Sequence, residues 1–111
     1  MSRPLMSAAA GALLRALLNR AGRDGARILL TDLTSVDWHS LTYAGERHLA
    51  GFAIGGSDAM ALAERWLSGI EDADLPIGKS RFVAEIKVTE APEVQEDGTV
   101  FLRIEALTLD S

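Results

Sequence analysis

Residues 82–106 constrain the fold most, because an alternating apolar pattern stands on both sides of a turn sequence. The alternation runs from Phe82 to Thr89 and returns from Val100 to Ala106, which is typical of half-buried strands. Pro92 is expected to end the first strand, and 96–98, which read Glu-Asp-Gly, supply a turn. The side chains expected to face the core are Phe82, Ala84, Ile86, Val88, Val100, Leu102, Ile104 and Ala106. The segment predicts an antiparallel hairpin.

The last strand continues past Ala106 with two leucines on its other face. Leu107 and Leu109 share a parity with Arg103 and Glu105, which are expected to point outward. Two large apolar side chains on an outward face would form an exposed apolar edge. We therefore treat both leucines as candidate subunit contacts.

Two helices are predicted at 2–21 and 59–70, each from apolar residues at helical spacing. Ser2 is expected to cap the first helix, with Pro4 in its first turn, and Gly22 to end it. The second helix carries Trp66, whose ring is expected to anchor the helix against a sheet.

A further pair of antiparallel strands is predicted at Arg27–Val36 and Leu49–Ile54. The order along the chain is then helix-strand-strand-helix-strand-strand. With short connections, this order gives an α+β fold in which one antiparallel sheet carries two helices packed on one face. At 111 residues, the whole chain, 1–111, is expected to be a single domain.

Charge is unevenly distributed along the chain. Residues 1–56 hold six basic and four acidic side chains, a net of +2, and residues 57–111 hold five basic and twelve acidic ones, a net of −7. One interpretation is random scatter. The other is a surface with two poles, which suits head-to-tail association of identical subunits. Neither half concentrates lysine and arginine as a nucleic-acid-binding surface does.

Several chemical functions find little support in the residues. The chain has no cysteine and no apolar run of about 18 residues, which argues against a thiolate metal site and a membrane-spanning helix. Gly78-Lys79-Ser80 lacks the earlier glycine of a phosphate-binding loop and precedes a strand instead of a helix. The glycines at 55–56, before Ser57, favour a plain turn over an anion site.

The segment between the first two strands holds side chains that could form a metal or catalytic site. Asp37, His39, Glu46 and His48 could meet across a hairpin, and Ser40 is the nucleophile closest to them in sequence. The histidines are nine positions apart, without recognisable ligand spacing, so a structural or surface role is favoured. We expect no cofactor, no bound metal and no enzymatic activity.

The same segment, Thr31–His48, holds one tryptophan and the only tyrosine of a chain that is 5% aromatic. Trp38 and Tyr43 either pack on their own sheet or anchor a partner from a projecting hairpin, since exposed aromatics bury much area at small entropic cost. The residues predicted to contact a partner are Trp38, His39, Leu41, Tyr43, Glu46, Leu107 and Leu109.

The residue pattern over 27–109 resembles a known family. The matching features are Asp37-Trp38-x-Ser40-x-Thr42, Gly45-Glu46-x-His48, Ala61-x-Ala63-Glu64, Ala73-Asp74-Leu75 and the turn at Asp97-Gly98. In this order and spacing they are similar to the small tail terminator, or tail completion, proteins of long-tailed phages, prophages and gene transfer agents.

The resemblance implies a non-enzymatic α+β protein that caps the tail tube as a ring, typically of six subunits. It implies contacts with the tail tube protein and with the head–tail connector protein, and a channel through which DNA passes without specific binding. It also implies a place in the tail of a virion or virion-like particle, after assembly in the bacterial cytoplasm, with no membrane partner.

Two alternatives remain open from the sequence. A small ligand-binding or regulatory domain would show a closed apolar pocket between its helices and sheet. An adaptor domain of a secretion system would share the order of elements and form dimers.

Overall fold

The computed structural model describes residues 6–111 as two helices, two 3-10 turns and four strands. The predicted α+β class, the element order and the packing of both helices against one antiparallel sheet are confirmed. In chain order the elements are α1 (Ala8–Arg20), η1 (Gly22–Arg27), β1 (Ile28–His39), β2 (Ala44–Ile54), α2 (Ala59–Leu67), η2 (Ile70–Asp72), β3 (Arg81–Val94) and β4 (Val100–Asp110).

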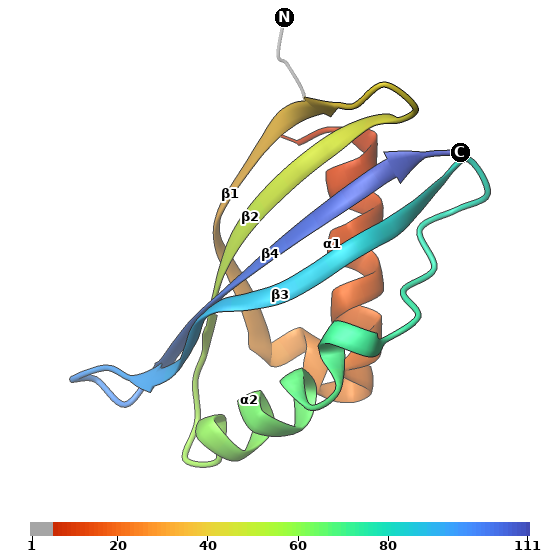
Figure 1. Ribbon diagram of the computed structural model, residues 1–111. Helices are drawn as coiled ribbons and strands as arrows, with labels where there is room; N and C mark the ends of the chain where they lie inside the picture. Colours follow the sequence, from red (N-terminus) through yellow and green to blue (C-terminus); the bar gives the residue numbers. More distant parts are fainter. Residues whose placement is uncertain (1–5) are drawn as a thin grey trace, which may run out of the picture.

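The four strands form one sheet in the order β1-β2-β4-β3 (Figure 1). All three pairings are antiparallel, so β2 and β4 are interior strands while β1 and β3 form the edges. The β1–β2 loop lies at one end of the sheet, and the β3–β4 hairpin projects from the other end. The two hairpins therefore point away from each other.

The core lies between the helices and the inner face of the sheet. Phe52 and Trp66 meet edge to face, with ring centroids 5.1 Å apart, and the indole Nε1–H of Trp66 donates to the carbonyl of Leu17 at 2.8 Å. One tryptophan thereby links α1, α2 and β2. The predicted anchoring role of Trp66 is confirmed, since only 3% of the residue is exposed.

The first helix begins later than predicted. Helix α1 starts at Ala8, and the hydroxyl of Ser7 accepts a hydrogen bond from the amide of Ala10 at 3.1 Å, as an N-cap does. The predicted cap at Ser2 and the first-turn proline, Pro4, lie outside the described residues. Gly22 follows the helix with φ of 62°, as expected for a residue that ends one.

At the start of β3, the prediction of which side chains face the core is wrong. The pairing with β4 shifts between Val83 and Glu85, so Ala84 is an extra residue that reverses the alternation. Val83 consequently packs against the core, while Phe82 moves to the outer face with 39% of its surface exposed.

Pro92 does not end the strand, which continues to Val94. The proline falls in a second irregular stretch, between the pairs Glu90–Arg103 and Glu93–Phe101. Because β3 is an edge strand with bulges, the missing amide of proline removes no bond from a regular ladder.

Candidate functional site: the outer face of the sheet

The β1–β2 hairpin is longer and tighter than the predicted projecting loop at Trp38–Glu46. Strands β1 and β2 reach His39 and Ala44, which leaves Ser40–Tyr43 as the connection. The hydroxyl of Ser40 accepts hydrogen bonds from the amides of Tyr43, at 3.0 Å, and Thr42, at 3.3 Å. Ser40 thus holds a fixed turn, with Leu41 fully exposed at its tip.

A row of residues crosses the outer face of the sheet next to this loop. Its members, from one edge to the other, are Trp38, Gly45, Leu109 and Phe82, paired by register on neighbouring strands. The ring of Tyr43 meets that of Phe82 edge to face, with centroids 6.0 Å apart. We call Trp38, Tyr43, Phe82, Leu107 and Leu109 the aromatic patch.

The prediction that Leu107 and Leu109 form an exposed edge is wrong. They do lie on the outer face, but each is only 7% exposed and β4 is an interior strand. The surface that the patch offers comes mainly from Tyr43 and Phe82, which are 43% and 39% exposed. The leucines form the floor between the neighbouring strands.

Register separates the remaining predicted contact residues from the patch. His39 and Glu46 have the parity of the inner face, where Glu46 accepts a hydrogen bond from the hydroxyl of Ser7 at 2.6 Å. His39 is exposed at the end of β1. The structure therefore groups Trp38 and Tyr43 with Leu107 and Leu109, and places His39 and Glu46 on the other side of the sheet.

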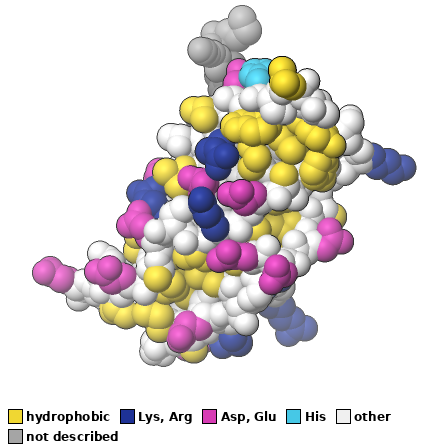
Figure 2. Space-filling view, viewed as in Figure 1, with side chains coloured by type: hydrophobic (Ala, Val, Ile, Leu, Met, Phe, Trp, Pro, Cys, Tyr) yellow, Lys and Arg dark blue, Asp and Glu magenta, His cyan; other side chains and the backbone are white. Residues whose placement is uncertain are grey.

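Ion pairs cover the middle of the outer face. Glu105 lies 3.0 Å from Arg47 and 3.5 Å from Lys87, while Arg103 lies 2.7 Å from both Asp32 and Glu90. The hydrogen bond from Arg103 lowers the pKa of Asp32, and the same bond raises the pKa of Arg103. In Figure 2, hydrophobic side chains gather on the upper part of this face and charged ones cross its middle. The outer face thus has an apolar end and a charge-paired centre.

His48 is buried on the inner face with both ring nitrogens occupied. Its Nδ1 lies 2.7 Å from the hydroxyl of Ser35, its Nε2 lies 2.8 Å from that of Thr108, and 1% of the residue is exposed. Burial lowers its pKa, an effect that the nearby charge of Glu46 opposes. Because both ring nitrogens have hydrogen-bond partners and the residue is buried, His48 is a core residue that joins three strands.

Metal ligation is not supported by the geometry. Within residues 6–111, no group of three or more histidine, cysteine, aspartate or glutamate side chains could hold a metal ion. Ser40, considered as a nucleophile, hydrogen-bonds to its own turn, whereas the hydroxyl that contacts His48 belongs to Ser35. In the same part of the chain, no helix has the length and apolarity needed to cross a membrane.

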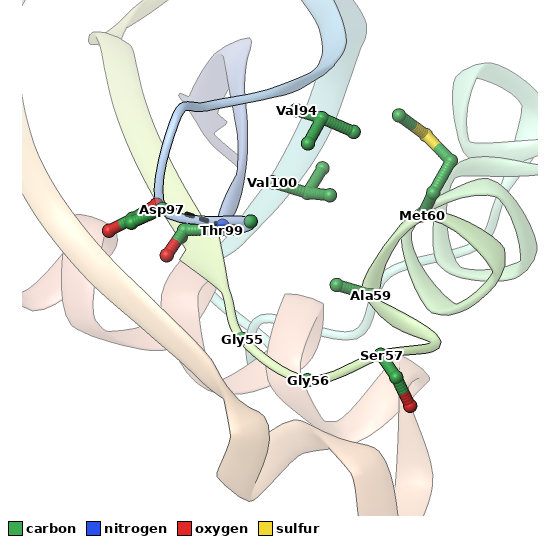
Figure 3. Close-up of a pocket in the computed structure, with 10 residues that line it drawn as sticks. Gly55, Gly56, Ser57, Ala59, Met60, Val94, Asp97, Thr99 and Val100 are labelled. Carbon is green, nitrogen blue, oxygen red and sulfur yellow. Dashed lines mark hydrogen bonds between the residues drawn. The ribbon is translucent and has the colours of Figure 1, made fainter.

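One pocket, of about 500 Å³, lies between the β2–α2 turn and the β3–β4 hairpin (Figure 3). Val94, Val100 and Met60 supply its apolar wall, and Asp97 and Thr99 come from the turn of the hairpin. It opens at the end of the sheet instead of being enclosed between helices and sheet. It therefore differs from the closed pocket that the small-ligand alternative expects.

The glycine turn beside this pocket is occupied by Arg27. The guanidinium donates to the carbonyl of Gly55 at 3.0 Å and pairs with the carboxylate of Asp58. Gly56 has φ of 106°, and a Cβ there would meet Arg27. A side chain of the protein thus already uses the space, which agrees with the interpretation of 55–57 as a plain turn.

Phe82 was missed as a surface residue by sequence reasoning. Simple alternation assigned it to the core, and the bulge at Ala84 that reverses the alternation leaves no glycine or proline as a marker. The one available signal was the pair Phe82 and Val83, since two adjacent large apolar residues require one to face outward.

Comparison with known proteins identifies a fold. The sequence matches no family model and no curated protein. The structure is similar to a chain of a solved structure described as "Virion of native gene transfer agent (GTA) particle", with a TM-score of 0.62 and 18% sequence identity. The similarity covers 95% of this chain and 97% of that chain, so the two proteins share one fold over nearly their entire lengths.

Proposed function

We propose that this protein is a non-enzymatic structural component of a gene transfer agent or phage-like particle. The observation that carries the proposal is the similarity, over 95% of this chain and 97% of the other, to a chain of a gene transfer agent virion. The resemblance of 27–109 to tail terminators, which rests on residue pattern instead of fold, supports the same conclusion.

Within such a particle, the proposed role is that of a tail terminator, or head–tail joining protein. Copies of the chain form a ring on the head-proximal end of the tail tube and stop its growth. One ring face contacts the tube protein and the other contacts the connector, while DNA passes through the centre. A net charge of −5 suits that channel, because like charge weakens non-specific binding to phosphates.

The aromatic patch is the surface proposed to contact a neighbouring subunit or the tube. Tyr43 and Phe82 are partly exposed aromatic rings on a floor of buried leucines, so they can bury apolar area without reorganising the strands. The ion pairs beside the patch leave few uncompensated charges on that part of the face. Such a surface suits a protein partner better than nucleic acid.

The test compares the capping of tail tubes by the native chain with capping by a double variant, Trp38→Ala with Tyr43→Ala. Tail tubes polymerised with the native chain should be capped and uniform in length by electron microscopy, whereas the double variant should give uncapped tubes of variable length. Thr34→Ala is the matched control, since Thr34 is exposed on β1 outside the patch. If the folded double variant still caps tubes, the patch is not the contact. If the native chain never caps tubes, the tail-terminator role is wrong.

A further inference from the structure

Two arginines, Arg20 and Arg65, line a hollow where the end of α1 meets α2. Arg20 donates to the carbonyl of Trp66 at 3.0 Å and to that of Ser68, which fixes its guanidinium. Arg65 lies 3.4 Å from Asp24, and Arg23, which precedes Asp24 in η1, is exposed. The hollow has a volume of about 160 Å³, with an apolar floor of Ala21, Leu62 and Trp66. It is large enough for one carboxylate side chain.

The turn of the β3–β4 hairpin has the opposite charge. Glu93, Glu96 and Asp97 are exposed, and none of them forms an ion pair with another residue in the described range 6–111. No basic residue occurs between Lys87 and Arg103. We call 93–97 the acidic tip.

The acidic tip is held in one conformation. The amide of Gln95 donates to the carbonyl of Thr99 at 2.7 Å, and the amide of Gly98 donates to the carbonyl of Gln95 at 2.9 Å. Asp97 accepts from the amide of Thr99 at 2.9 Å, and this bond lowers the pKa of its carboxyl. Glu93 and Glu96 are thus presented from a preorganised turn, which reduces the entropic cost of docking.

The tip and the arginine hollow cannot meet within one molecule. Figure 1 shows the β3–β4 hairpin projecting to one side of the fold, away from the junction of α1, η1 and α2. Their charges are complementary: three carboxylates stand on the tip, whereas two guanidinium groups and the single carboxylate of Asp24 line the hollow. Two such surfaces on opposite sides of a chain favour a heterologous contact between copies.

We propose that the acidic tip of one copy docks on the arginine hollow of a second copy. Glu96 or Glu93 enters the hollow and binds Arg20 and Arg65, and Arg23 contacts the other tip carboxylates. The inference rests on the proposed function in taking a second copy as the partner. Because the contact is electrostatic, added salt weakens it.

Disulfide trapping tests the contact cleanly, because the chain has no cysteine. Gln95→Cys places a thiol on the acidic tip, and Ser68→Cys places one beside Arg20, with every charge retained. The two variants are mixed at low salt under mild oxidation. We expect the mixed pair to cross-link about tenfold faster than Gln95→Cys mixed with Thr34→Cys, whose exposed site lies on β1.

Charge-reversal variants provide a second test in the same cross-linking experiment. Glu93→Lys with Glu96→Lys, added to the Gln95→Cys chain, should remove the rate advantage. Arg23→Glu with Arg65→Glu, added to the Ser68→Cys chain, should restore it. Equal rates for the test and control pairs at low salt would overturn the docking contact, and so would failure of this rescue between folded variants.

A chain that carries both Gln95→Cys and Ser68→Cys separates the inference from the proposed function. A ladder of trimers and larger products supports head-to-tail docking and agrees with a ring. Products that stop at dimers would show reciprocal pairing, which overturns the ring and leaves the docking contact in place. Equal cross-linking rates with capped tubes would overturn the contact and leave the ring in place.

Discussion

The rings of Tyr43 and Phe82 meet edge to face, with an interplanar angle of 81° and centroids 6.0 Å apart. Tyr43 closes the β1–β2 turn and Phe82 lies near the start of β3, so the contact spans the sheet from the loop of one hairpin to the opposite edge strand. Neither ring is fully buried. The pair both stabilises the end of the sheet and remains available to a partner.

A double-mutant cycle should measure this pair. Tyr43→Ala, Phe82→Ala and the double variant are expected to give a coupling energy of about 0.5–1.5 kcal/mol in urea unfolding, the usual range for edge-to-face pairs. The cycle of Tyr43→Ala with Val94→Ala is the control, because Val94 lies near the far end of β3. Additive effects for Tyr43 and Phe82 would contradict the contact.

Trp66→Phe should destabilise the fold by about 1–3 kcal/mol, because it leaves the carbonyl of Leu17 without the indole donor and opens space in the core. Trp38→Phe is the matched control at the other tryptophan. Trp38 is half-buried on the outer face, so its variant should change the free energy of unfolding by about 0.5 kcal/mol or less. Equal effects in denaturant titrations would show that Trp66 is not the link between the helices.

Stability should fall as the pH falls below about 6.5, because of His48. Burial lowers the pKa of this ring in the folded state, so below the ordinary value of 6.5 the unfolded chain binds more protons than the folded one. The stabilisation is complete above that pH and is lost as the pH falls through the lowered pKa. His48→Gln should flatten the dependence of the unfolding free energy on pH below about 6.5.

The control for that measurement is His39→Gln, since His39 is exposed at the end of β1. This variant should show the same dependence of the unfolding free energy on pH as the native chain. A pH dependence that survives in the folded His48→Gln variant would contradict the role given to His48.

Gly45→Ala should destabilise the sheet by about 1–3 kcal/mol, as overpacking does. A Cβ at this position would lie 1.9 Å from the carbonyl oxygen of Thr108, and backbone cannot move away as a flexible side chain can. Gly55→Ala is the control, because nothing lies within 4 Å of its Cβ position. Thermal unfolding of the two variants checks this, and a similar loss in both would rule out the close approach.

The sequence predicted the α+β class and the core face of β4, because Val100, Leu102, Ile104 and Ala106 alternate without interruption. It did not predict the phase at Phe82, since a single extra residue at Ala84 reverses the alternation and local propensity does not mark the bulge. The prediction that Pro92 ends the strand failed for a related reason. A proline excludes a regular interior strand, but the position of β3 at the edge depends on pairings distant in sequence.

The candidate site was predicted only in part, because the pairing of strands distant in sequence brings its residues together. Trp38 and Tyr43 were identified from their residue types, yet their neighbours Leu109 and Phe82 join them only through the order β1-β2-β4-β3. His48 was grouped with His39 by proximity in sequence, whereas strand parity and depth place one in the core and the other in solvent. The contact role of these residues stays a prediction.

The irregular pairing of β3 gives the sheet two edges of different character. Pro92 and three register shifts interrupt the row of backbone amides and carbonyls along β3, and Lys87 adds a charge to this edge. Both features hinder the addition of another strand. β1 has a single shift, between Leu30 and Asp32, and then pairs regularly to His39. Because an endless sheet needs two receptive edges on every copy, strand addition at β1 alone would end after two chains. The two different edges therefore disfavour open-ended polymerisation through the sheet.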